Sequence, residues 1–290
     1  MQRHLLFIVN PNAGKKKSGE IIKVIQEHMN KAFPYHIHVW ENKNDFDTIR
    51  NMLLSGTFTD AVAVGGDGTV NKVASAIRGT GIRLGILPAG SGNGLARTLN
   101  ISMDFRQALK QITSGQSQSI DSGVINGRDF FCTSGVGFDA HIAFLFSKSV
   151  SRGLWSYVKI TLGQLYRYKP ESYSIQLKDQ VLEKEAFLIT VANAGQYGND
   201  FYIAPEAKTD DGLFHVVLLK PWKFYELPLL FTKILLKKAH TCKQIETYTS
   251  DQVTIIRHSE GPVHFDGEPD MQGRTLAFSL HHNTLQVICG

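Results

Sequence analysis

Cysteine, long apolar runs and large basic blocks are all scarce in this sequence of 290 residues. The three cysteines are odd in number and lack metal-ligand spacing, which excludes a disulfide framework and indicates reduced thiols in a cytosolic protein. No apolar run approaches about eighteen residues, so we expect no membrane-spanning helix. The longest basic run is Lys15–Lys17, which is too short to favour a nucleic-acid partner.

The amino-terminal apolar run is also short. Leu5–Val9 follows Arg3 and His4 and is briefer than the apolar region of a signal peptide, so we expect a buried first strand. Lys and Arg exceed Asp and Glu by 31 to 26, which fits an anionic partner such as a nucleotide or an acidic membrane surface. A solvated surface rich in lysine explains the same excess.

The first 120 or so residues alternate strand and helix patterns. Such repeated units predict an α/β fold with a mainly parallel sheet covered on both faces. The expected strands are Leu5–Val9, His36–Trp40, Ala61–Val64 and Leu84–Leu87.

Beyond Asp121 the pattern changes to period-two segments with turn residues, which predicts an antiparallel β domain. Two long helices, His141–Tyr168 and Phe224–Ala239, are expected to interrupt it. We therefore divide the chain into an α/β domain, 1–122, and a β-rich domain, 123–290; the last strand of the second domain could return to the first. The crevice between domains is the default place for a site.

The stretch AVAVGGDGTVN, residues 61–71, combines a buried strand, a glycine turn and a helix. Glycines at such a junction allow the main chain to approach a ligand closely, and the helix N-terminus suits a phosphate. Asp67 would repel phosphate unless a cation such as magnesium stands between them. An ordinary glycine-rich turn is the alternative reading.

Two further loops resemble this one in composition and position. Parallel strands bring the loops after their carboxyl ends to one sheet edge, where open α/β sheets bind ligands. The three loops are Asn10–Lys15, Gly65–Thr69 and Pro88–Gly94. Together they predict a nucleotide-phosphate site.

The common nucleotide motifs do not fit. Gly14-Lys15 lacks the first glycine of a Walker P-loop, because Val9 holds that place, and Gly66–Asn71 lacks the third glycine of the dinucleotide fingerprint. Gly135–Ala140 does match G-x-G-x-x-A, but it lies outside any clear βαβ unit. We interpret it as a structural bend.

Taken together, the motifs resemble those of the diacylglycerol kinase catalytic domain family, which includes bacterial diacylglycerol kinases and sphingosine kinases. The resemblance extends over nearly the whole chain. It rests on VNPNAG, GGDGTVN, LPAGSGNGLAR, IDSG, GVGFDA, APEAKTDDGLF and FDGE. It implies an α/β nucleotide-binding domain followed by a β-sandwich domain, with ATP and Mg²⁺ as cofactors.

The resemblance also implies residue roles. Asp266, in the DGE element, is similar in position to the base that takes the lipid hydroxyl proton, with Glu268 beside it. A structural magnesium is implied at Asp211 and the carbonyls of Lys208 and Leu213, although a solvated polar turn is equally compatible with these residues. The residues implied to hold ATP and its magnesium are Asn10, Gly14, Gly66, Asp67, Gly68, Thr69, Gly90, Ser91, Gly92 and Asn93.

One position departs from the family pattern. Gly94 follows the loop asparagine where many diacylglycerol kinases have aspartate, so a carboxylate of the magnesium network is missing. This weakens any assignment of lipid identity and favours metal handling by Asp67, Asp121 and Glu268.

The resulting hypothesis is a cytoplasmic lipid kinase, peripheral at the inner membrane face, that phosphorylates a lipid hydroxyl, with diacylglycerol as first choice. Alternatives are a sphingoid-base kinase, an NAD kinase-like enzyme and a non-catalytic nucleotide or lipid sensor. Pro221–Leu227 with its following helix, and Arg152–Lys169, mix aromatic and basic residues suited to a membrane surface, or else form ordinary core-facing stripes. The sequence is compatible with a monomer and with a homodimer.

Overall fold

The chain forms two compact units. The computed structural model describes residues 2–12, 18–29, 33–40, 45–149 and 154–289. The first unit contains residues 1–120 with 283–290, and the second contains residues 121–282. The sequence placed the division after residue 122; in the structure it falls after residue 120, and the last residues lie in the first unit. Each unit is described by itself.

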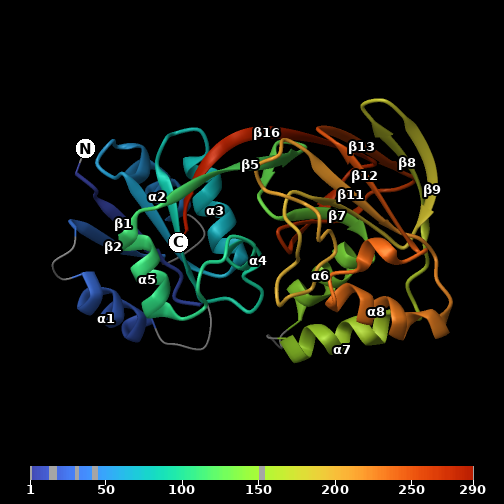
Figure 1. The fold of residues 1–290 in the computed structure, drawn as a ribbon, viewed down its shortest axis with the longest axis horizontal. Helices are drawn as coiled ribbons and strands as arrows, with labels where there is room; N and C mark the ends of the chain where they lie inside the picture. The colour runs from blue at the N-terminus through green and yellow to red at the C-terminus, as the bar shows by residue number, and fades with distance from the viewer. Residues whose placement is uncertain (1, 13–17, 30–32, 41–44, 150–153, 290) are drawn as a thin grey trace. The chain divides into compact units, whose positions relative to one another are not determined.

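The first unit alternates strands and helices, as Figure 1 shows. Its elements are β1 (Leu5–Val9), α1 (Ser18–Met29), β2 (Tyr35–Val39), α2 (Asp45–Leu54), β3 (Asp60–Gly65), α3 (Asp67–Ile77), β4 (Arg83–Pro88), α4 (Gly94–Thr98), α5 (Phe105–Ser114) and the start of β5 (Ser117–Ile125).

The four strands β2, β1, β3 and β4 pair in that order, all parallel. The carboxyl end of β16 (Thr275–Ile288) adds to β4, where Gln286 and Val287 pair in parallel with Arg83 and Leu84. The crossover from β1 to β2 runs in the opposite direction to those from β2 to β3 and from β3 to β4, and right-handed crossovers of opposite direction place their helices on opposite faces. Accordingly α1 contacts α5, whereas α2 contacts α3. Because helices cover both faces of the sheet, strands such as β1 are fully buried.

The second unit is mostly antiparallel sheet. Its elements are β6 (Arg128–Phe130), β7 (Thr133–Gly137), α6 (Phe138–Lys148), α7 (Leu154–Gln164), β8 (Glu171–Leu177), β9 (Val181–Ala186), β10 (Leu188–Ala192), β11 (Phe214–Leu219), the 3₁₀ turn η1 (Phe224–Glu226), α8 (Leu227–Leu235), the 3₁₀ turn η2 (Ala239–Thr241), β12 (Ile245–Ser250), β13 (Gln252–Arg257), β14 (Gly261–Phe265), β15 (Glu268–Gln272) and most of β16.

Two sheet layers enclose its core. One layer runs β12, β11, β10, β7, β14 and β15, and the other contains β13, β8, β9 and the amino-terminal part of β16. Inward side chains of both layers pack together, among them Val136, Phe214, Ile255 and Phe278. This is the sandwich arrangement, with alternate residues of each strand pointing inward. The α/β fold followed by a β-sandwich that the sequence predicted is confirmed.

Two helix predictions need correction. The helix expected over His141–Tyr168 is two helices, α6 and α7, because Ser149 takes an extended backbone and ends the first. The helix expected over Phe224–Ala239 is the η1 turn followed by α8. It stops early because Lys237 adopts a left-handed conformation, φ +60°, and the Lys238 N–H bonds back to the Lys233 carbonyl.

No helix within the described residues is long and apolar enough to cross a membrane.

Candidate functional site

The polar loops of the first unit follow the carboxyl ends of its parallel strands. Val9 pairs with Val64, and Gly65 pairs with Pro88, so the ends of β1, β3 and β4 are in register. The loops after β3 and β4 therefore begin next to each other. This is the sheet edge at which the sequence placed a phosphate site.

Close backbone packing explains the glycines. A Cβ on Gly90 would lie 2.5 Å from the Gly66 Cα and 2.9 Å from the Asn93 Oδ1, and one on Gly65 would collide with the Thr69 side chain. Side chains at these positions would push the two loops apart. Gly66 and Gly90 leave half-buried main chain beside the first turn of α3, where the Thr69 N–H donates to the Gly66 carbonyl at 2.9 Å.

Asp67 joins these two loops. Its Oδ2 accepts a hydrogen bond from the Asn93 N–H at 2.9 Å, and its Oδ1 accepts one from the Gly94 N–H at 2.7 Å. Asn93 takes a left-handed backbone, φ +52°, at the N-cap of α4. The carboxylate thus holds the start of α4 against the start of α3, in addition to any role toward a cation.

Side-chain hydrogen bonds fix the rest of this site. The Asn10 Nδ2 donates to the Thr69 Oγ1 at 2.9 Å, linking the loop after β1 to α3. The Asn93 side chain bonds both backbone groups of Gly90, accepting from its N–H at 3.1 Å and donating to its carbonyl at 2.9 Å. Ser91 is exposed, while Gly68 and Gly92 are half-buried. Gly14 lies outside the described residues.

Arg97 also supports the loop after β4, a role that was not predicted from the sequence. Its Nε donates to the Gly92 carbonyl at 3.2 Å, so α4 braces the loop that precedes it. The signal was available, because Arg97 lies within one helical turn of the SGNG segment and a cation beside a phosphate loop is favourable. Lys72, one turn into α3, lies over the Trp40 ring.

In the second unit, Asp266 and Gly267 form the turn between β14 and β15. Both have positive φ, +49° and +85°, and Phe265 pairs with Glu268, which defines a two-residue hairpin. The Asp266 carboxylate accepts three backbone N–H bonds, from Phe131 at 2.9 Å, Cys132 at 2.8 Å and Thr133 at 3.0 Å. Both of its oxygens are therefore engaged in holding the turn.

Glu268 differs from Asp266 in its exposure to solvent and in its hydrogen-bond partners. It is exposed, it begins β15 directly after the turn, and its carboxylate has no hydrogen-bond or ionic partner among the described residues. The hairpin fixes its backbone, while its side chain remains available to a substrate.

A buried polar network surrounds Asp139, the acidic residue of the GVGFDA motif. The Asp139 Oδ2 accepts hydrogen bonds from the Tyr197 hydroxyl at 2.8 Å, the His264 Nε2 at 3.1 Å and the Thr190 hydroxyl at 3.1 Å. Burial, reinforced by the Asp139 charge, raises the pKa of Tyr197 well above its usual value, so it stays a donor.

The glycines of the same motif make room for this network. A Cβ on Gly135 would lie 3.2 Å from both the Asp139 Oδ2 and the His264 Nε2, and Gly137 has φ +96°. The bend that the sequence predicted there is thus confirmed as geometry, and the motif also positions Asp139.

The proposed structural metal residues lie in a turn before β11. The Asp211 Oδ1 accepts from the Leu213 N–H at 3.1 Å, and the buried Asp121 accepts from the Gly212 N–H at 2.8 Å. Asp121 also contacts His282 at 2.7 Å. Among the described residues, no group of three or more histidine, cysteine or acidic side chains is arranged to hold a metal. Ligation by Lys208 and Leu213 carbonyls remains a prediction.

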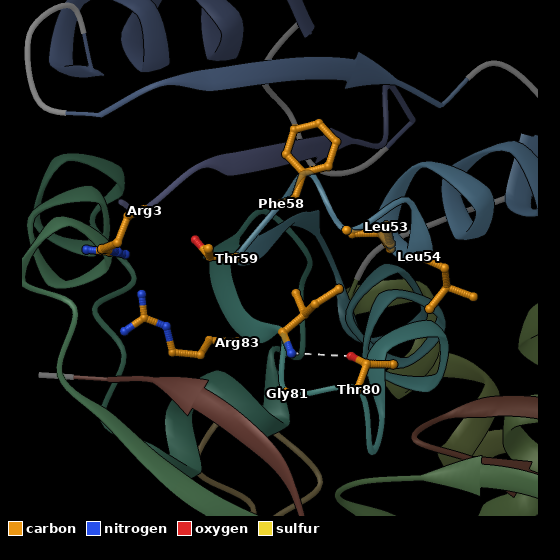
Figure 2. Close-up of a pocket in the computed structure, with 10 residues that line it drawn as sticks. Arg3, Leu53, Leu54, Phe58, Thr59, Thr80, Gly81 and Arg83 are labelled. Carbon is orange, nitrogen blue, oxygen red and sulfur yellow. Dashed lines mark hydrogen bonds between the residues drawn. The ribbon is translucent and has the colours of Figure 1, made fainter. Parts of the chain in front are cut away.

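A pocket in the first unit lies at the opposite sheet edge, where β1, β3 and β4 begin (Figure 2). The guanidinium groups of Arg3 and Arg83 both pair there with the fully buried Asp60, at 2.9 and 2.6 Å. Both arginines also donate to carbonyl oxygens around the end of α5. We interpret this cluster as a clamp on the strand starts rather than a substrate site.

Comparison with known proteins identifies the family to which this α/β unit and the following β-sandwich belong. Residues 4–125 match the family of the diacylglycerol kinase catalytic domain, and residues 133–289 match the family of the YegS C-terminal NAD kinase beta sandwich-like domain. The second match covers more than half of the chain, which therefore belongs to the family of the YegS C-terminal domain; with the diacylglycerol kinase catalytic domain matched in its first part, the chain is a lipid kinase.

Individual relatives agree. A probable lipid kinase YegS-like of Klebsiella pneumoniae (strain 342) is 27% identical over 281 residues, covering 95% of this chain and 92% of that protein. A diacylglycerol kinase of Staphylococcus saprophyticus is 24% identical over 274 residues, covering 92% and 90%. The crystal structure of a putative diacylglycerol kinase from Bacillus anthracis str. Sterne covers 100% of this chain and 97% of its own, with a TM-score of 0.80 at 23% identity, which supports the fold.

Proposed function

We propose that this lipid kinase transfers the γ-phosphoryl group of ATP to the hydroxyl of diacylglycerol, giving phosphatidic acid. The observation that carries the proposal is the joined pair of glycine loops, in which Gly66 and Gly90 pack main chain against main chain beside the first turn of α3. Phosphoryl transfer depends mostly on positioning and charge neutralisation, and closely packed glycine main chain at the positive end of a helix suits both.

The residues proposed to bind ATP are those named from the sequence. Asn10, Thr69 and Asn93 are already oriented by hydrogen bonds within the site, so they would meet the phosphates preorganised. Asp67 holds its carboxylate where the two loops meet, through the bonds from the Asn93 and Gly94 N–H groups, and carboxylate oxygens are ligands that magnesium prefers. Magnesium, when bound, would neutralise phosphate charge.

For the proton transfer we propose that the two acidic residues of the DGE element have different roles, one catalytic and one positioning. Glu268 takes the proton of the lipid hydroxyl, because its carboxylate is exposed and unpaired among the described residues. Asp266 holds the hairpin that presents Glu268, because three N–H groups occupy its oxygens. A structural magnesium at Asp211 and the Lys208 and Leu213 carbonyls is proposed as a separate support.

The experiment incubates the pure protein with magnesium and γ-labelled ATP, and separately with diacylglycerol in mixed micelles, sphingosine in mixed micelles, and NAD. We expect labelled phosphatidic acid as the main product. Preferential label in sphingosine would identify a sphingoid-base kinase, which the glycine at position 94 keeps as the second candidate. Label in NAD, or ATP binding with no transfer to any acceptor, would contradict the proposal.

A further inference from the structure

Helix α8 leaves most of its apolar residues outside the core. Seven of its nine residues, LPLLFTKIL, are apolar, yet in this helix Leu230 and Ile234 alone are buried. Leu229 is 62% exposed and Phe231 52% exposed. A helix so apolar and so exposed is unusual on a soluble surface, where large apolar patches mark interaction sites.

Helix α7 shows the same feature. None of its residues with a described side chain, 155–164, is buried; Trp155 is 86% exposed and Leu162 is 59% exposed. Just beyond the helix, Tyr166 is 73% exposed. These apolar side chains occur in a helix without a single acidic residue.

The two helices contribute to one continuous surface. The Tyr166 ring contacts the Phe224 ring of η1, with centroids 5.0 Å apart. Ile160 and Leu165 from the α7 segment pack against the same core cluster that contains Leu230 and Ile234 of α8. Since both segments share one core beneath them, their outward residues lie over neighbouring parts of the second unit. We call these outward residues the aromatic–basic surface: Trp155, Lys159, Leu162, Tyr166, Lys223, Phe224, Tyr225, Leu229, Leu235, Leu236 and Lys238.

Basic residues greatly outnumber acidic ones in the two segments that carry this surface. Residues 154–169 and 220–243 contain nine lysines and arginines and one acid, Glu226, although the whole chain has an excess of only five. Hydrogen bonds from the Lys223 backbone N–H and the Lys243 side chain lower the pKa of Glu226 to about 2, so this acid is ionised at neutral pH and pairs with Lys243. The ammonium groups of Lys159, Lys223 and Lys238 form no ion pair with an acidic side chain among the described residues.

We propose that the aromatic–basic surface docks on an anionic phospholipid bilayer. Aromatic and leucine side chains would enter the headgroup region, and the lysines would meet the negative surface potential. The inference rests on the proposed function insofar as a lipid acceptor must be reached in a membrane. A second copy of this chain is the less favoured occupant, because two surfaces with the same positive excess would repel each other.

The test is flotation of the full chain with vesicles, without ATP or substrate. Vesicles of phosphatidylcholine alone are compared with vesicles that also contain phosphatidylglycerol. We expect binding to the anionic vesicles, weakened at least about tenfold by the double variant Lys223→Glu/Lys238→Glu and by Leu229→Glu, since each basic residue near the surface contributes appreciably. Val181→Glu is the matched control for Leu229→Glu, because Val181 is 64% exposed on β9 of the same unit.

A second readout follows Trp155 directly. Trp40 is buried and Trp222 packs against the core cluster, so Trp155 is the tryptophan that a bilayer would surround. Anionic vesicles should shift the fluorescence emission of the protein to shorter wavelength, and Trp155→Phe should remove that shift.

The outcomes separate this inference from the kinase proposal. Vesicle binding that fails while diacylglycerol in detergent micelles is phosphorylated would overturn the docking surface alone. Equal binding to neutral and anionic vesicles, or equal weakening by Val181→Glu, would also overturn it. So would sedimentation velocity showing a dimer that Leu229→Glu dissociates, with vesicle binding unchanged. Binding that persists in a protein without kinase activity would support the surface and reject the proposed reaction.

Discussion

The glycine-loop site of the first unit and the DGE hairpin of the second use their aspartates alike but differ in what they leave exposed. Asp67 and Asp266 both accept backbone N–H bonds from a neighbouring loop. Around Asp67 the glycine main chain is half-buried and Ser91 is exposed; beside Asp266 both Gly267 and Glu268 are exposed. Each aspartate therefore ties its own site to a neighbouring loop through backbone hydrogen bonds.

The strongest way to break this comparison is to add one methyl group to the backbone site. Gly90→Ala places a Cβ 2.5 Å from the Gly66 Cα, so the two loops must separate. We expect phosphoryl transfer to fall about 100-fold, because misplacing reactive groups by about an ångström has that effect. Steady-state kinetics with ATP as the varied substrate gives the measurement.

Gly19→Ala is the control, since a Cβ on Gly19 in α1 of the same unit meets no atom within 4 Å. Normal kinetics for both variants would show that the close approach of the loops has no catalytic importance.

Asp67→Asn changes the hydrogen bonds between the two loops without adding bulk. The variant keeps the size of the side chain but turns one acceptor into an amide group that cannot accept from the Gly94 or Asn93 N–H. We expect about tenfold weaker use of ATP, together with an altered magnesium requirement, because a charged acceptor is lost. Titration of magnesium at fixed ATP checks this; an unchanged magnesium profile would limit Asp67 to holding the loops.

The buried network of the second unit predicts a stability effect rather than a kinetic one. Asp139→Asn disturbs three hydrogen bonds in a nearly dry site, so the free energy of unfolding should fall by about 2 kcal/mol. Urea unfolding followed by circular dichroism measures it. Asp179→Asn, at an exposed turn of the same unit, should change little; equal losses in the two variants would argue against the network.

The smallest expected effect concerns acid stability. Lys184, assisted by Lys220, lowers the pKa of Glu246 from 4.5 to about 2 in the folded protein. A lowered folded-state pKa adds stability that is complete above pH 4.5 and is lost as the pH falls toward 2. Glu246→Gln should therefore have a flatter stability profile across that interval, measured by thermal unfolding at several pH values. A profile parallel to that of the unchanged protein would show that this ion pair contributes nothing measurable.

Local patterns in the sequence predicted the first unit well. The i, i+3, i+4, i+7 stripe of Val70, Val73, Ala74 and Ile77 is buried in α3, and the strands before the glycine loops form as expected. These features depend on neighbours in the chain. The register of the parallel strands then follows from standard crossovers, so the meeting of two glycine loops was accessible from sequence.

The second unit was less predictable because its key contacts join distant residues. Asp266 bonds to the backbone of Phe131, 135 positions away, and the GVGFDA glycines make room for a histidine from β14. No periodicity reports such partners. The sequence prediction of Asp266 as the base stays a prediction; the structure adds that Asp266 accepts three backbone N–H bonds and that Glu268 beside it is exposed.

The most direct test of the account compares Glu268→Gln with Asp266→Asn in the diacylglycerol assay. We predict that Glu268→Gln removes formation of labelled phosphatidic acid with an unchanged melting temperature, whereas Asp266→Asn lowers the free energy of unfolding by about 2 kcal/mol as well as the rate. Near-normal phosphatidic acid formation by Glu268→Gln would contradict the account.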